Sequence, residues 1–450
     1  MKMENKKYSI NRREFLKRLG LGTAITTTAL AGCKSATTTD ESDVPTDKMT
    51  YRTNHNTGDK VSILGYGCMR WPRKKTGKNE NELDQEAINE LVDYALEHGV
   101  NFFDTAPVYC QGRSEAATGI ALKRHPRNKY FIATKLSNFS NSSRENSILM
   151  YKRSMELLQV DYIDYYLLHS LGGKDDFHRR YLDNGILDYL MEERKAGRIR
   201  NLGFSFHGNL ESIKYILSYH EKVHWDFCMI QMNYSDWRFS DIGQIYDLLA
   251  EMNIPTNIME PLLGGRLSNV PKHIADRLKA QEPEKSVASW AFRFVGSYPN
   301  ILSIQSGMVR HEHLVDNIRT FSPLKPLNED EKQFLFETAE IMRQSPTIPC
   351  NDCKYCMPCP YGLDIPGILL HYNKCVNEGN YLRSSTDENY KKARRAFLVG
   401  YDRAVEKERQ ASHCVGCRQC NPLCPQQIDI PKQMRMIDGY VERLKQGKEF

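Results

Sequence analysis

Eight of the 13 cysteines in this 450-residue chain lie in two short runs near its C-terminal end. The first run, Cys350–Pro360, reads CNDCKYCMPCP, and the second, Cys414–Pro425, reads CVGCRQCNPLCP. Each run has three cysteines separated by two residues, then a fourth cysteine directly before a proline. Three thiolates at this spacing can surround one face of a small inorganic cluster, and the fourth can reach elsewhere because the proline turns the chain away. The runs therefore predict metal ligands at Cys350, Cys353, Cys356, Cys359, Cys414, Cys417, Cys420 and Cys424.

The spacing resembles that of bacterial two-cluster ferredoxins, in which the fourth cysteine of each run binds the other [4Fe–4S] cluster. The resemblance implies crossed ligation, with Cys424 completing the first set and Cys359 the second. Zinc is the alternative, although it usually takes two separated Cys-x-x-Cys pairs rather than three cysteines of one run. The runs also share a repeat, CPYGLDIP at 359–366 and CPQQIDIP at 424–431, which indicates a duplicated cluster-binding half.

A second chemical set stands at or just after the ends of three consecutive β-rich runs: Asp104, Tyr109, Lys135 and His169. Reducing a carbonyl requires a hydride on carbon and a proton on oxygen. A free tyrosine has a pKa of about 10, too high for ready donation near neutrality, and a neighbouring ammonium lowers that pKa. We therefore interpret Tyr109 as the general acid and Lys135 as the group that lowers its pKa. Asp104 would hold Lys135 charged and oriented, and His169 would steer the substrate oxygen. Each residue alone has an ordinary structural explanation, but the four together favour a catalytic site.

These residues need a scaffold that brings strand ends together, and residues 51–320 have a suitable pattern of β-rich runs alternating with amphipathic helices. The expected strands are 61–65, 100–104, 130–134, 162–168, 199–204, 227–231, 256–259 and 301–304. The expected helices include 84–98, 144–158, 186–195, 210–218, 242–252 and 284–295. Eight such units predict a closed (β/α)8 TIM barrel, whose active sites lie at the C-terminal ends of the strands. A doubly wound sheet is the alternative, disfavoured because no G-x-G-x-x-G follows any strand.

Three motifs of this region resemble the aldo-keto reductase family. They are FFDTA at 102–106 with its following tyrosine, Thr134-Lys135, and LLH at 167–169. The resemblance covers residues 51–322 and, with the cysteine runs, is to the subgroup that carries a C-terminal ferredoxin-like domain. It implies an oxidoreductase that interconverts a small-molecule carbonyl and an alcohol, with two [4Fe–4S] clusters passing electrons to or from a redox partner. The alternative is an exported electron-transfer or ligand-binding protein whose barrel is not catalytic.

The same resemblance implies NADP or NAD as a cofactor, held at particular strand ends. In the family, a Ser-Asn pair after the fifth strand and a Gln at the end of the sixth hold the nicotinamide amide. Ser205 and Gln231 occupy those positions here, but Phe206 stands where the Asn is expected. An aromatic residue usually stacks on the nicotinamide after the seventh strand, and Met259 replaces it.

The contacts to the rest of the nucleotide are also altered. The family's Lys-Ser pair after the eighth strand, which holds the 2′-phosphate, is replaced near Gly307-Met308. Arg310 and Asn317 remain as candidate contacts to phosphate and adenine. The sequence therefore leaves NADP, NAD or neither open.

Residues 1–33 have the features of a targeting segment. NRREFLK at 11–17 resembles the twin-arginine export signal, and the apolar stretch 19–31 is too short to be a stable membrane span. LAGC, ending at Cys33, resembles a lipoprotein processing box in which the cysteine takes the lipid. We therefore expect a periplasmic or cell-envelope lipoprotein, anchored to a membrane through Cys33. The alternative is a chance arginine pair before a weak apolar run.

Length and charge complete the division of the chain. A 450-residue chain is long enough for two or three domains. The net charge of +6 is concentrated in the leader, so nothing in it indicates nucleic-acid binding. We expect a polar linker at 34–50, the barrel at 51–322 and a mainly α-helical cluster domain at 323–450. In that domain the patterns predict a helix at 328–344, a helical spacer at 366–411 and a final helix ending near Lys448.

Overall fold

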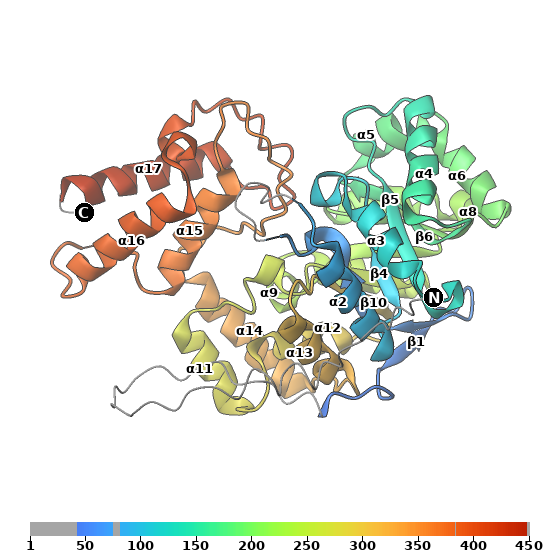
Figure 1. Ribbon diagram of the computed structural model, residues 1–450, viewed down its shortest axis with the longest axis horizontal. Coiled ribbons are helices and arrows are strands. Elements are labelled where there is room, and N and C mark those ends of the chain that lie inside the picture. The colour runs from blue at the N-terminus through green and yellow to red at the C-terminus, as the bar shows by residue number, and fades with distance from the viewer. Residues whose placement is uncertain (1–42, 75–81, 383, 448–450) are drawn as a thin grey trace, which may run out of the picture. The chain divides into compact units, whose positions relative to one another are not determined.

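The computed structural model describes residues 43–74, 82–382 and 384–447, which fall in one compact unit (Figure 1). The predicted export segment at 1–33, with Cys33, and most of the linker at 34–50 lie outside the described residues. Within the described ranges, no helix is long and apolar enough to cross a membrane.

Eight parallel strands close into a barrel in the order β10-β3-β4-β5-β6-β7-β8-β9. They are β3 (Leu64–Gly67), β4 (Phe102–Asp104), β5 (Phe131–Leu136), β6 (Ile163–Leu171), β7 (Ile199–Phe206), β8 (Phe227–Gln231), β9 (Thr256–Met259) and β10 (Ile301–Ser306). Most of their side chains are buried and apolar, as expected for parallel strands covered on both faces. The predicted barrel is confirmed, and the closed order excludes a doubly wound sheet.

The predicted first strand, 61–65, differs from the structure. It divides into β2 (Lys60–Ser62) and β3, because the chain turns where the Ser62 hydroxyl bonds to a main-chain carbonyl two residues on. β2 pairs antiparallel with β1 (Tyr51–Thr53), and Arg52 donates to three carbonyls around the start of β10. This hairpin therefore lies at the N-terminal end of the barrel, away from the predicted site.

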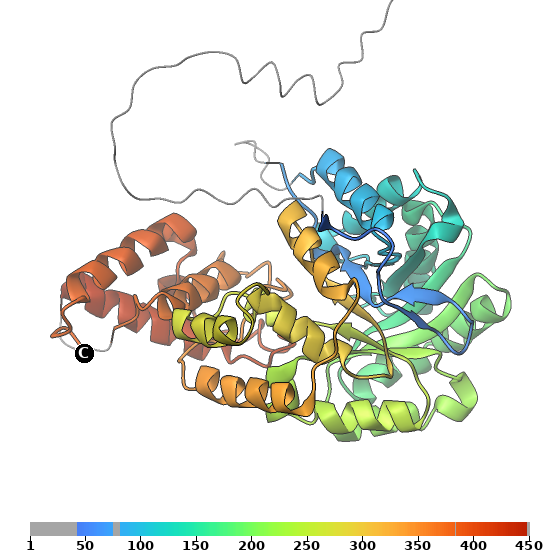
Figure 2. The ribbon, with the colours of Figure 1, turned by 90° about the horizontal axis from the view of Figure 1, so that it is seen from below.

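Helices cover the outside of the barrel (Figures 1 and 2). The longer ones are α2 (Gln85–Glu97), α3 (Ser114–Leu122), α4 (Arg144–Leu158), α6 (Ile186–Lys195), α7 (Leu210–Leu217), α10 (Ile242–Glu251), α11 (Lys272–Gln281), α12 (Val287–Gly296), α13 (His311–Phe321) and α14 (Glu329–Arg343). Shorter ones are η2 (Cys68–Arg70), η3 (Tyr109–Gln111), η4 (Arg127–Lys129), α5 (Lys174–Phe177), η5 (His178–Leu182), α8 (His220–Val223), α9 (Tyr234–Phe239) and η6 (Leu263–Gly265). The predicted barrel helices are present with small shifts at their ends. α3 was missed because it is buried on most sides and so shows no polar face.

The cysteine region has a hydrophobic core of its own. It is built by α15 (Ile365–Asn377), α16 (Tyr390–Ala404) and α17 (Ile430–Gln446), with short turns η7 (Lys407–Arg409) and η8 (Ala411–His413). The predicted spacer at 366–411 is therefore two helices. α14 packs instead with the barrel core, through Leu335 and Ala339.

The repeated Asp-Ile-Pro sequence starts a helix after each cysteine run. The Asp364 carboxylate accepts from the N–H of Gly367, and the Asp429 carboxylate accepts from that of Lys432. The proline of each copy lies in the first turn, where an N–H has no helical partner. α15 and α17 therefore leave the two runs in the same way.

Candidate active site

Asp104 and Lys135 form the buried base of the site. Asp104 ends β4, and Lys135 lies in the neighbouring strand β5. The Lys135 ammonium donates to both Asp104 carboxylate oxygens at 2.7 Å and to the Thr105 carbonyl at 2.8 Å. Because these residues are buried, the pair is desolvated and its polar groups satisfy one another. Burial raises the pKa of Asp104 above its ordinary value, and the Lys135 charge opposes that shift.

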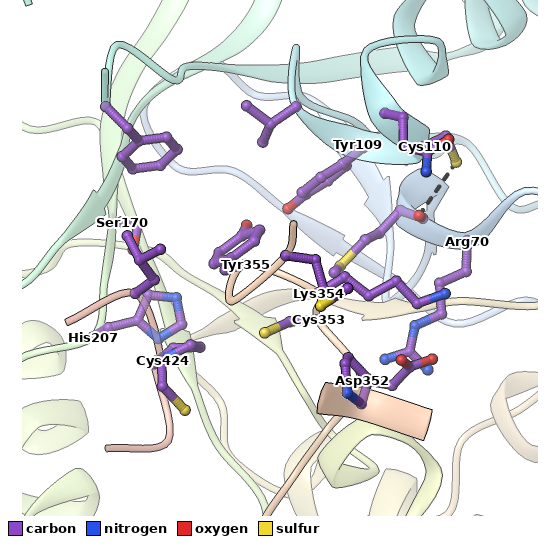
Figure 3. A pocket seen from close by; sticks show the side chains of 18 of the residues that line it. Arg70, Tyr109, Cys110, Ser170, His207, Asp352, Cys353, Lys354, Tyr355 and Cys424 are labelled. Carbon is purple, nitrogen blue, oxygen red and sulfur yellow. Dashed lines mark hydrogen bonds between the residues drawn. The ribbon is translucent and has the colours of Figure 1, made fainter. Parts of the chain in front are cut away.

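Tyr109 lies over this pair. It begins η3, the turn after β4, in which Cys110 and Gln111 have φ angles of 50° and 58°. The turn directs the phenol into the pocket at the barrel mouth (Figure 3). Lys135 Nζ lies 5.0 Å from the centre of the Tyr109 ring, and the His169 ring meets that ring edge-on with centres 6.0 Å apart. The structure thus brings the four predicted catalytic residues together.

His169, in β6, is held in place as a neutral imidazole. Its Nδ1 lies 2.6 Å from the Ser137 hydroxyl, and its main-chain N–H donates to the Tyr181 hydroxyl at 2.9 Å. Burial lowers the pKa of His169 well below its ordinary value, and the charges of Lys135 and Arg180 lower it further. A neutral imidazole can make one hydrogen bond from Nε2, as donor or acceptor.

The prediction that Lys135 lowers the pKa of Tyr109 is not met in the structure. The pKa of Tyr109 is raised well above its ordinary value, first by burial and then by Tyr355, Asp104 and Glu260. The Lys135 charge is balanced by Asp104 at 2.7 Å, which reduces its field at the phenol. Tyr109 is therefore neutral and keeps its proton until negative charge develops beside it.

Tyr355, which the sequence did not predict as a site residue, completes the pocket. It lies in the first cysteine run, its hydroxyl is 3.3 Å from His169 Nε2, and its proximity adds to the burial that raises the pKa of Tyr109. Figure 3 shows the two tyrosine hydroxyls directed toward one another. The sequence shows an aromatic residue between two cysteines, but nothing in it indicates that this loop reaches the barrel mouth.

A cavity of about 2580 Å³ opens on these two tyrosines. Phe139 and His207 line it from the barrel, and Lys354 and Cys424 line it from the cysteine region. The barrel and the cysteine region therefore share one pocket at the carboxyl ends of the strands.

Two of the predicted nicotinamide contacts are engaged within the protein. The Ser205 hydroxyl accepts from the N–H of Ser170 at 2.7 Å. Gln231 Nε2 donates to Asp236 at 2.7 Å, and Gln231 Oε1 accepts from Gln426 at 2.9 Å. Gln426 directly follows the second cysteine run, so this barrel residue is held by the C-terminal region.

The other predicted nucleotide contacts lie beyond the end of β10. Asn317 is buried and donates to the Ser306 hydroxyl at 2.9 Å. Arg310 lines the large cavity, whereas Ser205, Gln231 and Asn317 do not. The structure therefore does not bring the four predicted nucleotide contacts to one cavity.

Cys350, Cys353, Cys356 and Cys424 come together. They line a small cavity, and each of the three thiols of the first run interacts electrostatically with Cys424. Burial raises the pKa of Cys350 to about 11 and that of Cys353 to about 12. The set would therefore hold protonated thiols when empty, and metal binding would release those protons.

The second set joins the remaining cysteines. Burial, together with the neighbouring Cys417, Cys414 and Cys359, raises the pKa of Cys420 to about 11. Cys424 thus stands with the first three cysteines of the first run, and Cys359 interacts with Cys420 of the second, which is consistent with the grouping that crossed ligation requires.

Each set has the four thiols that a [4Fe–4S] cluster requires. In the part of the chain that the structure describes, no three His, Cys, Asp or Glu side chains converge closely enough to hold one metal ion. Zinc needs four ligands about 2.0–2.3 Å from one ion. In a [4Fe–4S] cube each thiolate binds a different iron, so the four sulfurs remain apart. The described cysteines are free thiols, as such ligands must be.

The sequence matches the Aldo/keto reductase family model over residues 63–334, more than half of the chain. The chain belongs to the aldo/keto reductase family. This aldo/keto reductase is 30% identical to "Probable aldo-keto reductase 1" of Glycine max over 228 residues, covering 48% of this chain and 61% of the soybean protein. It thus spans less than two thirds of that relative. It is 25% identical to "Uncharacterized oxidoreductase YqkF" of Bacillus subtilis over 312 residues, covering 62% of this chain and 94% of the other.

Solved structures share the fold of the barrel. The holo form of aldo-keto reductase AKR11C1 from Bacillus halodurans has a TM-score of 0.52 and 24% identity, covering 64% of this chain and 96% of that one. An aldo/keto reductase from Klebsiella pneumoniae, in complex with NADP and acetate, has a TM-score of 0.52 and 19% identity. The match covers 66% of this chain and 95% of the Klebsiella chain. Family membership and relatives named as reductases and dehydrogenases identify this aldo/keto reductase as an oxidoreductase. The family match ends at residue 334, before the first cysteine run.

Proposed function

We propose that this aldo/keto reductase interconverts a small-molecule carbonyl and an alcohol at Tyr109. We also propose that its two cysteine sets hold [4Fe–4S] clusters that pass electrons to or from a redox partner. The catalytic part rests on the buried Lys135–Asp104 pair beneath Tyr109, with neutral His169 across the pocket. The cluster part is supported by the pairing of each fourth cysteine with the other run.

The residues have distinct tasks. In the reducing direction, Tyr109 and His169 bind the carbonyl oxygen, and Tyr109 gives it a proton as negative charge develops there. Lys135, 5.0 Å from the ring centre, stabilises the phenolate that remains, and Asp104 keeps Lys135 in position. In the oxidising direction the phenolate takes the proton back. A bound nicotinamide would supply or accept a hydride, and bound clusters single electrons.

Turnover of a panel of aldehydes and ketones tests the catalytic part, with NADPH, NADH and reduced methyl viologen each offered as donor. Tyr109→Phe removes the proton donor and keeps the ring, so we expect kcat/KM to fall about 10²–10⁴-fold. Tyr215→Phe, on the outer helix α7, is the matched control and should behave as wild type. Equal activity of Tyr109→Phe and wild type would refute the role of Tyr109.

Iron and acid-labile sulfide analysis of anaerobically prepared protein tests the clusters. Two [4Fe–4S] clusters require about eight irons and eight sulfides per chain. Cys424→Ser should lower both contents, whereas Cys375→Ser, at a buried cysteine outside the two sets, should not. Zinc without sulfide would contradict the cluster assignment.

A second candidate is an electron-transfer or ligand-binding protein with a non-catalytic barrel. The observation that favours it is Tyr355, whose hydroxyl takes up contacts of both Tyr109 and His169. Turnover separates the two candidates. Protein with full clusters that converts none of the carbonyls with any of the three donors would favour the second.

We further propose export by the twin-arginine route and a lipid anchor on Cys33, giving a periplasmic or cell-envelope protein. The support is NRREFLK, the apolar stretch after it and LAGC, in that order. Clusters assembled in the reducing cytoplasm need an export route for folded protein. Cys33→Ser should abolish labelling by a radioactive fatty acid. The double substitution Arg12→Lys and Arg13→Lys should retain the precursor in the cytoplasm. Unlabelled wild-type protein would contradict the anchor.

A further inference from the structure

Two segments of the cysteine region are fixed to the carboxyl rim of the barrel. Asn351 packs so closely on the turn after β9 that a Cβ added to Gly264 would come 2.4 Å from the Asn351 oxygen. Arg70, in the turn after β3, donates to the same carbonyl. Gln426, directly after the second run, donates to Gln231 at the end of β8 at 2.9 Å. Direct contacts therefore hold both runs over the strand ends.

The amide expected to hold a nicotinamide is already paired at both of its ends. Gln231 Nε2 donates to Asp236, and its Oε1 accepts from Gln426. Phe206, in place of the second amide, has no hydrogen-bonding side chain. A nicotinamide carboxamide would have to break these bonds and leave their polar groups unpaired, which disfavours its binding.

The large cavity reaches Tyr109, the proposed proton donor, without reaching the two predicted nicotinamide contacts. Tyr109, Tyr355 and His207 line it, whereas Ser205 and Gln231 do not (Figure 3). A carbonyl compound that enters this cavity therefore meets Tyr109, while the two predicted nicotinamide contacts lie outside the lining and only Arg310, a predicted phosphate contact, lies within it.

The first cysteine set borders the same cavity. Cys353 and Cys424 line both the large cavity and the small cavity of the set. Tyr355, two residues after Cys353, contacts Tyr109 and His169. A group held by these cysteines would lie next to the catalytic pocket.

Resting on the carbonyl–alcohol activity proposed above, we infer that the cysteine region takes the place of the nicotinamide and that the reducing co-substrate is a one-electron carrier. Two equivalents of the reduced carrier each lose one electron. The C=O π bond breaks, its electron pair forms the O–H bond, and the two donated electrons form the C–H bond. Both hydrogens arrive as protons, the one on oxygen from Tyr109.

Titration of the full chain, with both clusters in place, by NADPH and by NADH tests the inference without any substrate. Nicotinamide fluorescence and the visible absorbance of the clusters should show no saturable change at nucleotide concentrations up to about 1 mM. A dissociation constant above about 1 mM corresponds to a binding free energy weaker than about 4 kcal/mol. A nicotinamide-binding member of the family, titrated in parallel, establishes that binding is detectable. Saturable binding at micromolar concentration, or bleaching of the clusters by either nucleotide, would overturn the inference.

Carbonyl reduction in D2O gives a second test that separates this inference from the proposed function. With reduced methyl viologen as donor, the new C–H position of the alcohol should carry deuterium from the solvent. NADPH-driven turnover that leaves this carbon without solvent deuterium would overturn the inference and leave the carbonyl–alcohol activity intact. Failure to turn over with either donor would refute the proposed activity, and the nucleotide titration would still decide the inference.

Discussion

Tyr355 contacts both groups that are proposed to bind the carbonyl oxygen. Its hydroxyl lies 3.3 Å from His169 Nε2, and Figure 3 shows it directed toward the Tyr109 hydroxyl. A substrate oxygen must take over at least one of these contacts. At the scale of single residues, Tyr355 of the cysteine region therefore competes with the substrate oxygen for the groups proposed to bind it.

Removing the Tyr355 hydroxyl should ease substrate entry. Tyr355→Phe keeps the ring and gives up the hydrogen bond with His169, worth about 0.5–1.5 kcal/mol, so we expect KM for carbonyls to fall about two- to ten-fold. Tyr361→Phe, at an exposed tyrosine just after the first run, is the matched control. A rise in KM for Tyr355→Phe would contradict the competition and make Tyr355 a substrate contact.

His169 should make stability depend on pH. Burial lowers its pKa well below the ordinary 6.5, so the folded state stays neutral while the unfolded chain takes up a proton as pH falls through 6.5. This uptake favours unfolding, and below that pH His169 lowers the free energy of unfolding by up to about 1.4 kcal/mol per pH unit.

Urea unfolding at about pH 7 and about pH 5.5 measures this effect. The midpoint of the wild type should fall more than that of His169→Gln, because the variant lacks the titrating group. An equal fall in the two proteins would contradict the assignment of a buried neutral imidazole.

At the scale of elements, η6 holds the first cysteine run against the barrel rim. Gly264 and Gly265 there have φ angles of 66° and 99°, which favour glycine. Only Gly264 faces the run, since its added Cβ would meet Asn351 at 2.4 Å, whereas that of Gly265 would meet the Ser268 hydroxyl at 3.8 Å. Substituting each glycine in turn therefore distinguishes the effect of backbone strain from the effect of a lost contact with the first cysteine run.

Gly264→Ala should loosen the first cysteine run more than Gly265→Ala does. Both changes strain the backbone by about 1–3 kcal/mol, but only the first also displaces Asn351. Hydrogen exchange measured by mass spectrometry should be faster for residues 350–356 in Gly264→Ala than in Gly265→Ala. Equal exchange in that segment would show that the contact with η6 does not hold the run.

The sequence predicts those parts of the fold whose signals are local. Buried parallel strands read as short apolar runs, and outer helices such as α4 and α10 have one apolar face, so the alternation indicates a barrel. The first strand was misplaced because a hydrogen-bonded turn at Ser62 divides one apolar run into two strands. α3 was missed because burial on most sides removes the amphipathic pattern.

The same distinction between local and long-range signals applies to the candidate site. Asp104, Lys135 and His169 could be predicted because each ends or lies in a strand next to a short motif. Tyr355 and Gln426 could not, because their contacts with the barrel join segments far apart in the chain, and no spacing or periodicity encodes them. The pKa of Tyr109 also depends on burial and on the balance of charges around it, which only the folded structure supplies.

At the scale of the whole molecule, the barrel provides the acid–base residues and the cysteine region borders them. Cys353 and Cys424 line the cavity on which Tyr109 opens. A cluster held by the first set would therefore lie beside the proposed proton donor.

The most direct test of this account is a single turnover observed through the clusters. Anaerobic protein is reduced with one-electron donor, excess donor is removed, a carbonyl substrate is added, and the visible cluster absorbance is followed in wild type and in Tyr109→Phe of equal iron content. The account predicts that the absorbance recovers as alcohol forms in the wild type, and recovers at least about 10²-fold more slowly in the variant. Equal recovery in the two proteins, or no recovery in wild type with a carbonyl that it reduces, would contradict it.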